Sequence, residues 1–172
     1  MSKIQIYQGD ITKLKIEAIV NAANKTLLGG GGVDGSIHRA AGPKLLEECR
    51  KLKGCNVGEA KITKGYNLPA SYVIHTVGPI YGTDNIKTQE AQLYCCYICS
   101  LSLAKENNIH TIAFPSISTG YYGFPHEKAC EIALNGVLTW LKFNKDYNME
   151  VTFCCYDPET FRLYNKKLQS IM

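Results

Sequence analysis

The most unusual stretch of the sequence is a run of four glycines, Gly29 to Gly32, with an acid, Asp34, two residues further on. It lies in the segment NAANKTLLGGGGVDGSIHRAAG, residues 21–42. A glycine-rich loop that opens a helix, here expected at Gly35, exposes backbone N–H groups that suit a phosphate. A plain loop in which Asp34 serves as the helix N-cap explains the same pattern.

Two familiar phosphate motifs do not fit this loop. Gly30-x-Gly32-x-x-Gly35 has the spacing of the dinucleotide fingerprint, but it begins ten positions after Val20, where the preceding apolar segment runs out. In that fingerprint the first glycine follows its strand at once, and an acid ends the next strand about 20 residues on. A Walker loop is excluded because no Gly-Lys-Ser/Thr follows the glycines.

A second loop has similar chemistry. The segment FPSISTGYYGFP, residues 114–125, follows a predicted strand, precedes a predicted helix, and carries the hydroxyls of Ser116, Ser118 and Thr119 and two glycines. It is a second plausible phosphate cradle. Two such loops at one edge of a sheet would suit two phosphates, and so a pyrophosphate.

Polar side chains accompany the first loop. Asn21 and Asn24 flank the end of a short apolar segment, where an Asn either satisfies loop backbone or contacts a ligand. Asp34 precedes His38 by four residues, so the two share a helix face. They form either a local ion pair or a poised acid–base group.

Two further residues end predicted strands. Asp10, in QGDIT, forms either an Asx turn or an acceptor for the exocyclic amine of a base. Tyr156, in FCCYDP, is either a core residue or a ring that stacks on a base.

The composition is that of a globular protein. The chain has 172 residues, of which 45% are hydrophobic and 20% charged, with a formal net charge of +4. A chain of this length buries enough surface to form a core without disulfides or metals. The basic residues are scattered rather than gathered in a stripe, so we expect no nucleic-acid partner.

The eight cysteines could indicate a disulfide-rich secreted protein. The N-terminal MSKIQIYQGD contains no apolar core of a signal peptide, and no stretch is long and apolar enough to span a membrane. We therefore expect a cytoplasmic protein with reduced thiols and no membrane partner. Cys95, Cys96 and Cys99 lack a second pair at zinc-site spacing, so we read them as buried thiols and expect no metal site.

The hydrophobic patterns alternate between strand and helix. Leu93, Tyr97 and Leu101 share one face of a long helical segment, and Gly42–Pro43 breaks an earlier one. Asp157 and Pro158 are a natural N-cap and first residue for the last helix. Strands are expected over 3–8, 18–22, 59–66, 71–79, 110–116 and 149–156, and helices over 35–52, 87–107, 126–144 and 157–171.

This alternation predicts an α/β protein: a three-layer α/β/α sandwich with a mixed, mostly parallel central sheet, in a single domain over residues 1–172. The first strand is the candidate for antiparallel pairing. Ligands of such sheets lie beyond the carboxyl ends of the strands. The loops after Val20, Phe114 and Cys155 are therefore the places to look for a site.

In this order and spacing, GDIT, NAANKTLLGGGGVDGSIHRAAG, HTVGPIY and PSISTGYYGFP resemble the sequence motifs of macrodomains. The resemblance covers the chain from about Lys3 to Gln169, and the long first motif is most similar to the MacroD-type branch. It implies the macrodomain fold and a site for ADP-ribose, with no cofactor and no metal.

The resemblance also implies residue roles. Asp10 would accept the adenine amine beside Ile11, and Tyr156 would stack on the adenine. Asn24 would hold the distal ribose hydroxyls and Asp34 would be the acidic catalytic group, so these two are the implied catalytic residues. The remaining implied ligand contacts are Ala22, Gly30, Gly31, Gly32 and Val33 in the first loop, and Ser116, Ile117, Ser118, Thr119, Gly120, Tyr121 and Tyr122 in the second.

MacroD-type proteins remove mono-ADP-ribose from acidic side chains of modified proteins and deacetylate O-acetyl-ADP-ribose, so the resemblance implies a hydrolase that cleaves esters at the distal ribose. Its partners would be ADP-ribose, mono-ADP-ribosylated proteins and O-acetyl-ADP-ribose, and we expect a monomer. The alternative is a module that binds ADP-ribose without turnover, because a fold does not fix a function. An RNA-binding regulator is a third hypothesis, supported only by the charge and the tyrosines.

Overall fold

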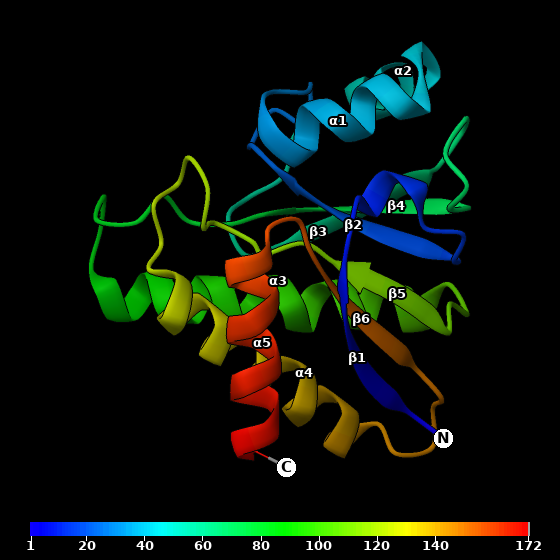
Figure 1. Cartoon of the computed structure of the whole chain (residues 1–172). Coiled ribbons are helices and arrows are strands. Elements are labelled where there is room, and N and C mark those ends of the chain that lie inside the picture. The colour runs from blue at the N-terminus through cyan, green and yellow to red at the C-terminus, as the bar shows by residue number, and fades with distance from the viewer. Residues whose placement is uncertain (172) are drawn as a thin grey trace.

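The computed structural model describes residues 1–171 and shows one six-stranded sheet between two layers of helices (Figure 1). The strand order is β1-β6-β5-β2-β4-β3. The elements are β1 (Lys3–Gln8), the short 3₁₀ helix η1 (Ile11–Lys13), β2 (Ala18–Ala23), α1 (Gly32–Ala41), α2 (Pro43–Leu52), β3 (Ala60–Lys64), β4 (Tyr72–Val77), α3 (Ile86–Glu106), β5 (Thr111–Phe114), α4 (His126–Phe143), β6 (Glu150–Cys155) and α5 (Pro158–Ile171).

The predicted α/β/α sandwich is confirmed. Helices α1 and α2 cover one face of the sheet, and α3, α4 and α5 cover the other (Figure 1). The strand residues divide between two cores accordingly. In β2, Ile19 packs with the core under α1 and α2, whereas Ala18 and Val20 pack with the core under the other three helices. This period of two, with both faces buried, explains why the strand reads as a continuous apolar run.

The expectation for the first strand was wrong. β1 pairs in parallel with β6, with Ile4 opposite Val151, and the antiparallel strand is β3, with Ile62 opposite Ile74 of β4. The connection from β3 to β4 is a short turn over residues 65–71, which returns the chain in the opposite direction beside itself. β1 instead joins a strand from the far end of the chain, so no hairpin constrains its direction.

The helix boundaries also refine the sequence interpretation. α1 begins at Gly32 rather than Gly35, and Gly31, not Asp34, occupies its N-cap. Glycine is tolerated at an N-cap, so the helix can begin inside the glycine run. The break at Gly42 and the capping role of Asp157, whose Oδ1 accepts from the Thr160 N–H at 2.8 Å, are confirmed.

The cysteine cluster of α3 is only partly buried, contrary to expectation. Cys96 is buried, Cys99 is half-buried and Cys95 is exposed. Successive helix positions turn by about 100°, so Cys95 and Cys96 cannot share a face. All eight cysteines are free thiols. Among residues 1–171, no helix is long and apolar enough to cross a membrane.

Candidate functional site

A cavity of about 940 Å³ lies beyond the carboxyl ends of the parallel strands. Three sets of loops surround it: the loop from β1 into η1, the glycine loop before α1, and the segments that follow β5 and β6. The structure brings every sequence-predicted site residue to its wall: Asp10, Ile11, Ala22, Asn24, Gly30, Gly31, Gly32, Val33, Asp34, Ser116, Ile117, Ser118, Thr119, Gly120, Tyr121, Tyr122 and Tyr156.

The glycine loop presents the uncapped start of α1 to this cavity. Gly31 offers no side chain to cap the helix, so the first N–H groups of α1 remain available to a ligand. A Cβ added at Gly31 or Gly32 would meet no atom of the described residues within 4 Å, so these glycines face open space. Gly35 is tightly packed instead, because a Cβ there would lie 2.5 Å from the carbonyl oxygen of Gly30. The loop therefore exposes unpaired backbone N–H donors, and the close contact between Gly35 and the Gly30 carbonyl fixes the course of its backbone.

The second loop offers a row of similar donors. None of the backbone N–H groups of residues 118–122 donates to an acceptor within the described chain. Ser118 adopts a left-handed backbone, with φ of 65°, and its buried Oγ has no partner among residues 1–171. Turns of mixed handedness place successive N–H groups around an anion. The two loops thus present unpaired backbone donors to one cavity, which is the arrangement that the predicted pair of phosphate sites requires.

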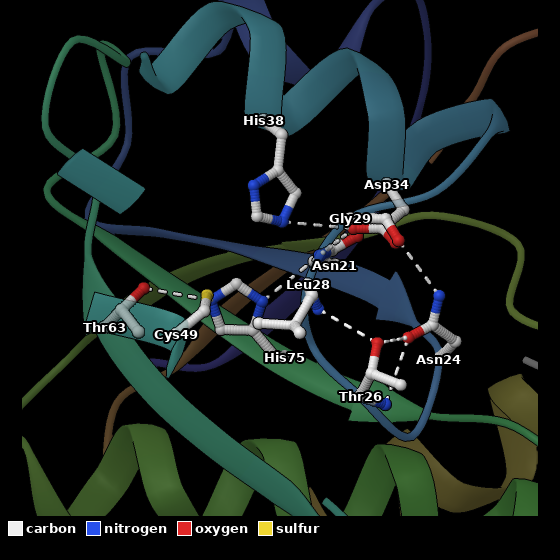
Figure 2. Close-up of polar contacts among 10 residues, drawn as sticks. All are labelled: Asn21, Asn24, Thr26, Leu28, Gly29, Asp34, His38, Cys49, Thr63 and His75. Atoms are coloured by element: carbon white, nitrogen blue, oxygen red, sulfur yellow. Dashed lines mark hydrogen bonds and ion pairs between the residues drawn. The ribbon is translucent and has the colours of Figure 1, made fainter. Parts of the chain in front are cut away.

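Asp34 is the buried acid of the cavity wall, with 4% of its surface exposed. Its Oδ1 accepts a hydrogen bond from Asn21 Nδ2 at 2.9 Å and lies 3.4 Å from His38 Nε2 (Figure 2). Burial raises the pKa of this carboxyl, and the Asn21 hydrogen bond and the His38 charge oppose that rise. Asp34 and His38 do share a helix face, as their spacing predicts.

Asn21 connects Asp34 to a histidine on the neighbouring strand β4. The Asn21 Nδ2 lies 3.1 Å from His75 Nδ1, and His75 Nε2 lies 2.9 Å from Thr63 Oγ1 (Figure 2). The Thr63 hydroxyl donates to the Lys64 carbonyl, so it accepts from His75 Nε2–H. Burial holds the pKa of His75 down at about 3, which keeps the ring neutral. This fixes the tautomer: Nδ1 accepts from Asn21, and Nε2 donates to Thr63.

Asn24 has a different task from Asn21. Its Oδ1 accepts from the Thr26 N–H at 3.1 Å and from the Thr26 hydroxyl, and its Nδ2 donates to the Gly29 carbonyl at 3.0 Å (Figure 2). The side chain therefore satisfies loop backbone, one of the two alternatives, while it also lines the cavity. A Cβ on Gly30 would lie 3.4 Å from Asn24 Nδ2 and 3.1 Å from Asp34 Oδ2, so both polar groups lie close together on the side of the loop toward which that Cβ would point.

The opposite end of the cavity holds Asp10 and Tyr156. Asp10 Oδ1 accepts from the Thr12 N–H at 2.9 Å and from its hydroxyl at 2.7 Å, which forms the Asx turn and lowers the pKa of Asp10. Tyr156 is 85% exposed at the rim, so the core alternative for this residue is wrong. An ionised acceptor and an exposed ring at one end suit an aromatic base with an amine.

The sequence interpretation missed several residues of the wall, among them the cationic or polar side chains of Arg39, Ser36 and His126. Ser36 and Arg39 lie one helical turn apart, with Arg39 Nη2 at 3.2 Å from Ser36 Oγ, so the helical period was the available signal. His126 begins α4 directly after the second loop. Residues 1–171 contain no cluster of three His, Cys, Asp or Glu side chains that could hold a metal ion.

The sandwich, the two loops of unpaired backbone donors and the buried acid define an α/β protein with a candidate anion-binding site at the carboxyl ends of its strands, and comparison with known sequences identifies its family. Residues 20–133, more than half of the chain, match the model of the Macro domain. The chain belongs to the macrodomain family.

Individual relatives are similar over nearly the whole chain. The human "ADP-ribose glycohydrolase MACROD2" is 57% identical over 96% of this chain, which spans only 39% of that protein. A Methanosarcina mazei "Macro domain-containing protein" is 53% identical over 100% of this chain and 91% of its own length. A point mutant of the Oceanobacillus iheyensis macrodomain, solved with ADPR, superposes with a TM-score of 0.95 at 41% identity, covering 99% of this chain and 94% of the other.

Proposed function

We propose that this protein is a hydrolase that releases mono-ADP-ribose from acidic side chains of modified proteins and deacetylates O-acetyl-ADP-ribose. The observation that carries the proposal is the Asp34 carboxylate, held by Asn21 in the wall of a cavity whose other walls offer free backbone donors. The names of its relatives and the ADPR-bound structure of a neighbour support the same ligand and class of reaction.

The ligand would lie in the cavity in one direction. The adenine would lie between Asp10 and Tyr156, and the diphosphate would lie between the N–H groups of residues 118–122 and the start of α1. The distal ribose then reaches Asn24, Asp34 and Tyr122. Burial and the nearby Asp34 carboxylate raise the pKa of Tyr122, so its hydroxyl remains protonated near the reacting end.

The reaction adds one water across an ester and yields ADP-ribose and a carboxylic acid. Asp34 would accept a hydrogen bond from the attacking water, and its raised pKa makes it a better proton acceptor than an exposed carboxylate. The donors of the glycine loop would stabilise negative charge, and the fixed walls would orient the ribose. Either bond of the ester, C1″–O or acyl carbon–O, is open to attack by a water held in this way.

The test is turnover by matched variants. Purified protein is incubated with a glutamate-linked mono-ADP-ribosylated protein and, separately, with O-acetyl-ADP-ribose. Asp34→Asn keeps an oxygen for the Asn21 hydrogen bond but removes the charge, and we expect it to lose at least about 100-fold in kcat while retaining ADP-ribose affinity. Asp146→Asn, which changes an exposed acid, is the control and should match wild type.

The second candidate function is ADP-ribose binding without catalysis. It is favoured by Asn24, whose Oδ1 and one of whose two Nδ2 hydrogens bond to the loop, which leaves a single N–H for a substrate. Calorimetry that shows ADP-ribose binding, together with no product from either substrate, would replace the hydrolase by a binding module.

We also propose that the protein acts as a monomer in the cytoplasm, a reducing compartment that suits its eight free thiols.

A further inference from the structure

A second cavity, of about 520 Å³, adjoins the first at its reacting end. The two share three wall residues, Asn24, Gly78 and Tyr122. Asn24 and Tyr122 are the residues that the proposed function places at the distal ribose. The second cavity therefore begins where the bond to be cleaved would lie.

A loop between β4 and α3 builds the outer wall of this cavity. The buried Gln89 holds it: Nε2 donates to the Ile80 carbonyl at 2.6 Å and to Thr83 Oγ1 at 3.0 Å, and Oε1 accepts from the Gly82 N–H at 2.9 Å. The Tyr81 N–H donates to the Tyr122 carbonyl at 2.8 Å, which ties this wall to the second donor loop. The cavity is thus preformed rather than a gap between mobile segments.

The lining is apolar at the floor and polar at the rim. Val57, Val77 and Pro79 form the floor, and Ile80 is 48% exposed beside them. Lys25 and Asp84 are the charged residues among those that line it, and one lysine is too little to hold a phosphate chain. The polar members of the lining are the exposed Thr26 and Thr83, the half-buried Gln92, and the buried Gln89, whose amide is already bonded to the loop.

This lining fits a polypeptide. Apolar pockets accept side chains, and amide or hydroxyl groups at a rim bond to an extended backbone. When ADP-ribose fills the first cavity, the modified side chain must leave it at the distal ribose, because the ester is attached there. The protein that carries the modification then lies next to the wall formed by Asn24 and Tyr122.

We propose that this second cavity is the acceptor-side groove, which binds the polypeptide segment around the ADP-ribosylated acidic residue. The proposal rests on the proposed hydrolase function and names the second half of its substrate. It implies that the enzyme selects modified sites by the residues beside them, with Ile80 as the apolar contact. O-acetyl-ADP-ribose carries only an acetyl group and, on this proposal, should not extend to Ile80.

The test compares Ile80→Glu with wild type on two substrates. For a short peptide with one mono-ADP-ribosylated glutamate flanked by apolar residues, the kcat/KM of Ile80→Glu should be about tenfold lower than that of wild type. The variant places a charge where an apolar contact is buried. Turnover of O-acetyl-ADP-ribose and affinity for ADP-ribose should remain unchanged. Ile171→Glu, which alters an isoleucine of similar exposure at the end of α5, should match wild type on both substrates.

A second measurement uses the Asp34→Asn background, in which the peptide is not consumed. The modified peptide should bind more tightly than free ADP-ribose, and Ile80→Glu should abolish that difference. Equal peptide and ADP-ribose affinities in the parent, with peptide turnover unaffected by Ile80→Glu, would overturn the groove while leaving the hydrolase intact. Wild-type protein that turns over neither substrate would instead refute the hydrolase.

Discussion

Asn21 Nδ2 lies 3.1 Å from His75 Nδ1, so a fully buried neutral imidazole orients the amide that holds the Asp34 carboxylate. The contact crosses from β4 to β2, two hydrogen-bonded strands in which Asn21 and His75 occupy paired positions. The register of the sheet therefore sets the geometry of the acid.

His75→Leu should impair catalysis more than binding. It leaves a buried Asn21 N–H without an acceptor, which costs about 1–3 kcal/mol and lets the amide leave Asp34. We expect kcat for O-acetyl-ADP-ribose to fall about tenfold with ADP-ribose affinity little changed. His75→Gln retains an acceptor and a donor and should recover part of the rate. If His75→Leu and His75→Gln have equal kcat values and equal stability in urea, the orientation of Asn21 by His75 plays no part in the mechanism.

Asp34 should give the protein a pH-dependent penalty in stability. Because burial raises its folded pKa above the ordinary 3.8, folding favours the protonated acid. The favourable contribution is complete below 3.8 and is lost as pH rises through the folded pKa. Asp34→Asn should therefore be more stable than wild type at about pH 7, and the gap should close on acidification. Urea midpoints for both proteins between about pH 3.5 and pH 7, values chosen to span the raised pKa, measure this.

His38→Gln should shift the pH–rate profile upward. The His38 charge acts to lower the Asp34 pKa, so its removal raises the pH at which the carboxylate forms. The ascending limb of log kcat/KM against pH for O-acetyl-ADP-ribose reports this shift. The exposed His110, at the opposite end of the sheet, offers His110→Gln as a control whose limb should stay in place. A His38→Gln profile that overlays wild type would show that the pair is not electrostatically coupled during catalysis.

Gly120→Val should separate ligand binding from folding. A Cβ at Gly120 meets no atom of residues 1–171 within 4 Å, so the melting temperature should change little. The same side chain would enter the space in which the diphosphate approaches the backbone donors, and ADP-ribose affinity measured by calorimetry should fall at least about tenfold. Gly35→Ala is the contrasting variant, because its Cβ would press on the Gly30 carbonyl and lower stability as well. Undiminished affinity in Gly120→Val would place the diphosphate elsewhere.

The fold could be predicted from the sequence because strand and helix patterns alternate and each shows the hydrophobic period of its buried face. The loops that line the cavity could be predicted too, since the loops that follow parallel strands lie at one edge of the sheet. Asp34 and the donor loops are local features, visible in one segment each. The direction of β1 was not visible, because a hydrophobic pattern does not name the neighbouring strand.

Contacts between segments that lie far apart in the sequence could not be predicted either, because the pattern of one segment does not say which other segment packs beside it. His75 reads as one polar residue in an apolar strand, and only the register with β2 shows that it faces Asn21. Gln89 reads as a polar residue near the start of a helix, yet it is buried and holds the loop that contains Ile80. Cavities formed between such segments have no signature in either segment alone.

The partition between the two cavities has a thermodynamic consequence. Asn24, Gly78 and Tyr122 face both spaces, so an occupant of one alters the surface offered to the other. Thermodynamic linkage makes this effect reciprocal. If bound ADP-ribose raises the affinity for the polypeptide, the polypeptide raises the affinity for ADP-ribose by the same factor. In the proposed reaction, hydrolysis would separate the two ligands. If each ligand strengthens the binding of the other, the departure of one product would weaken the binding of the second and so favour its release.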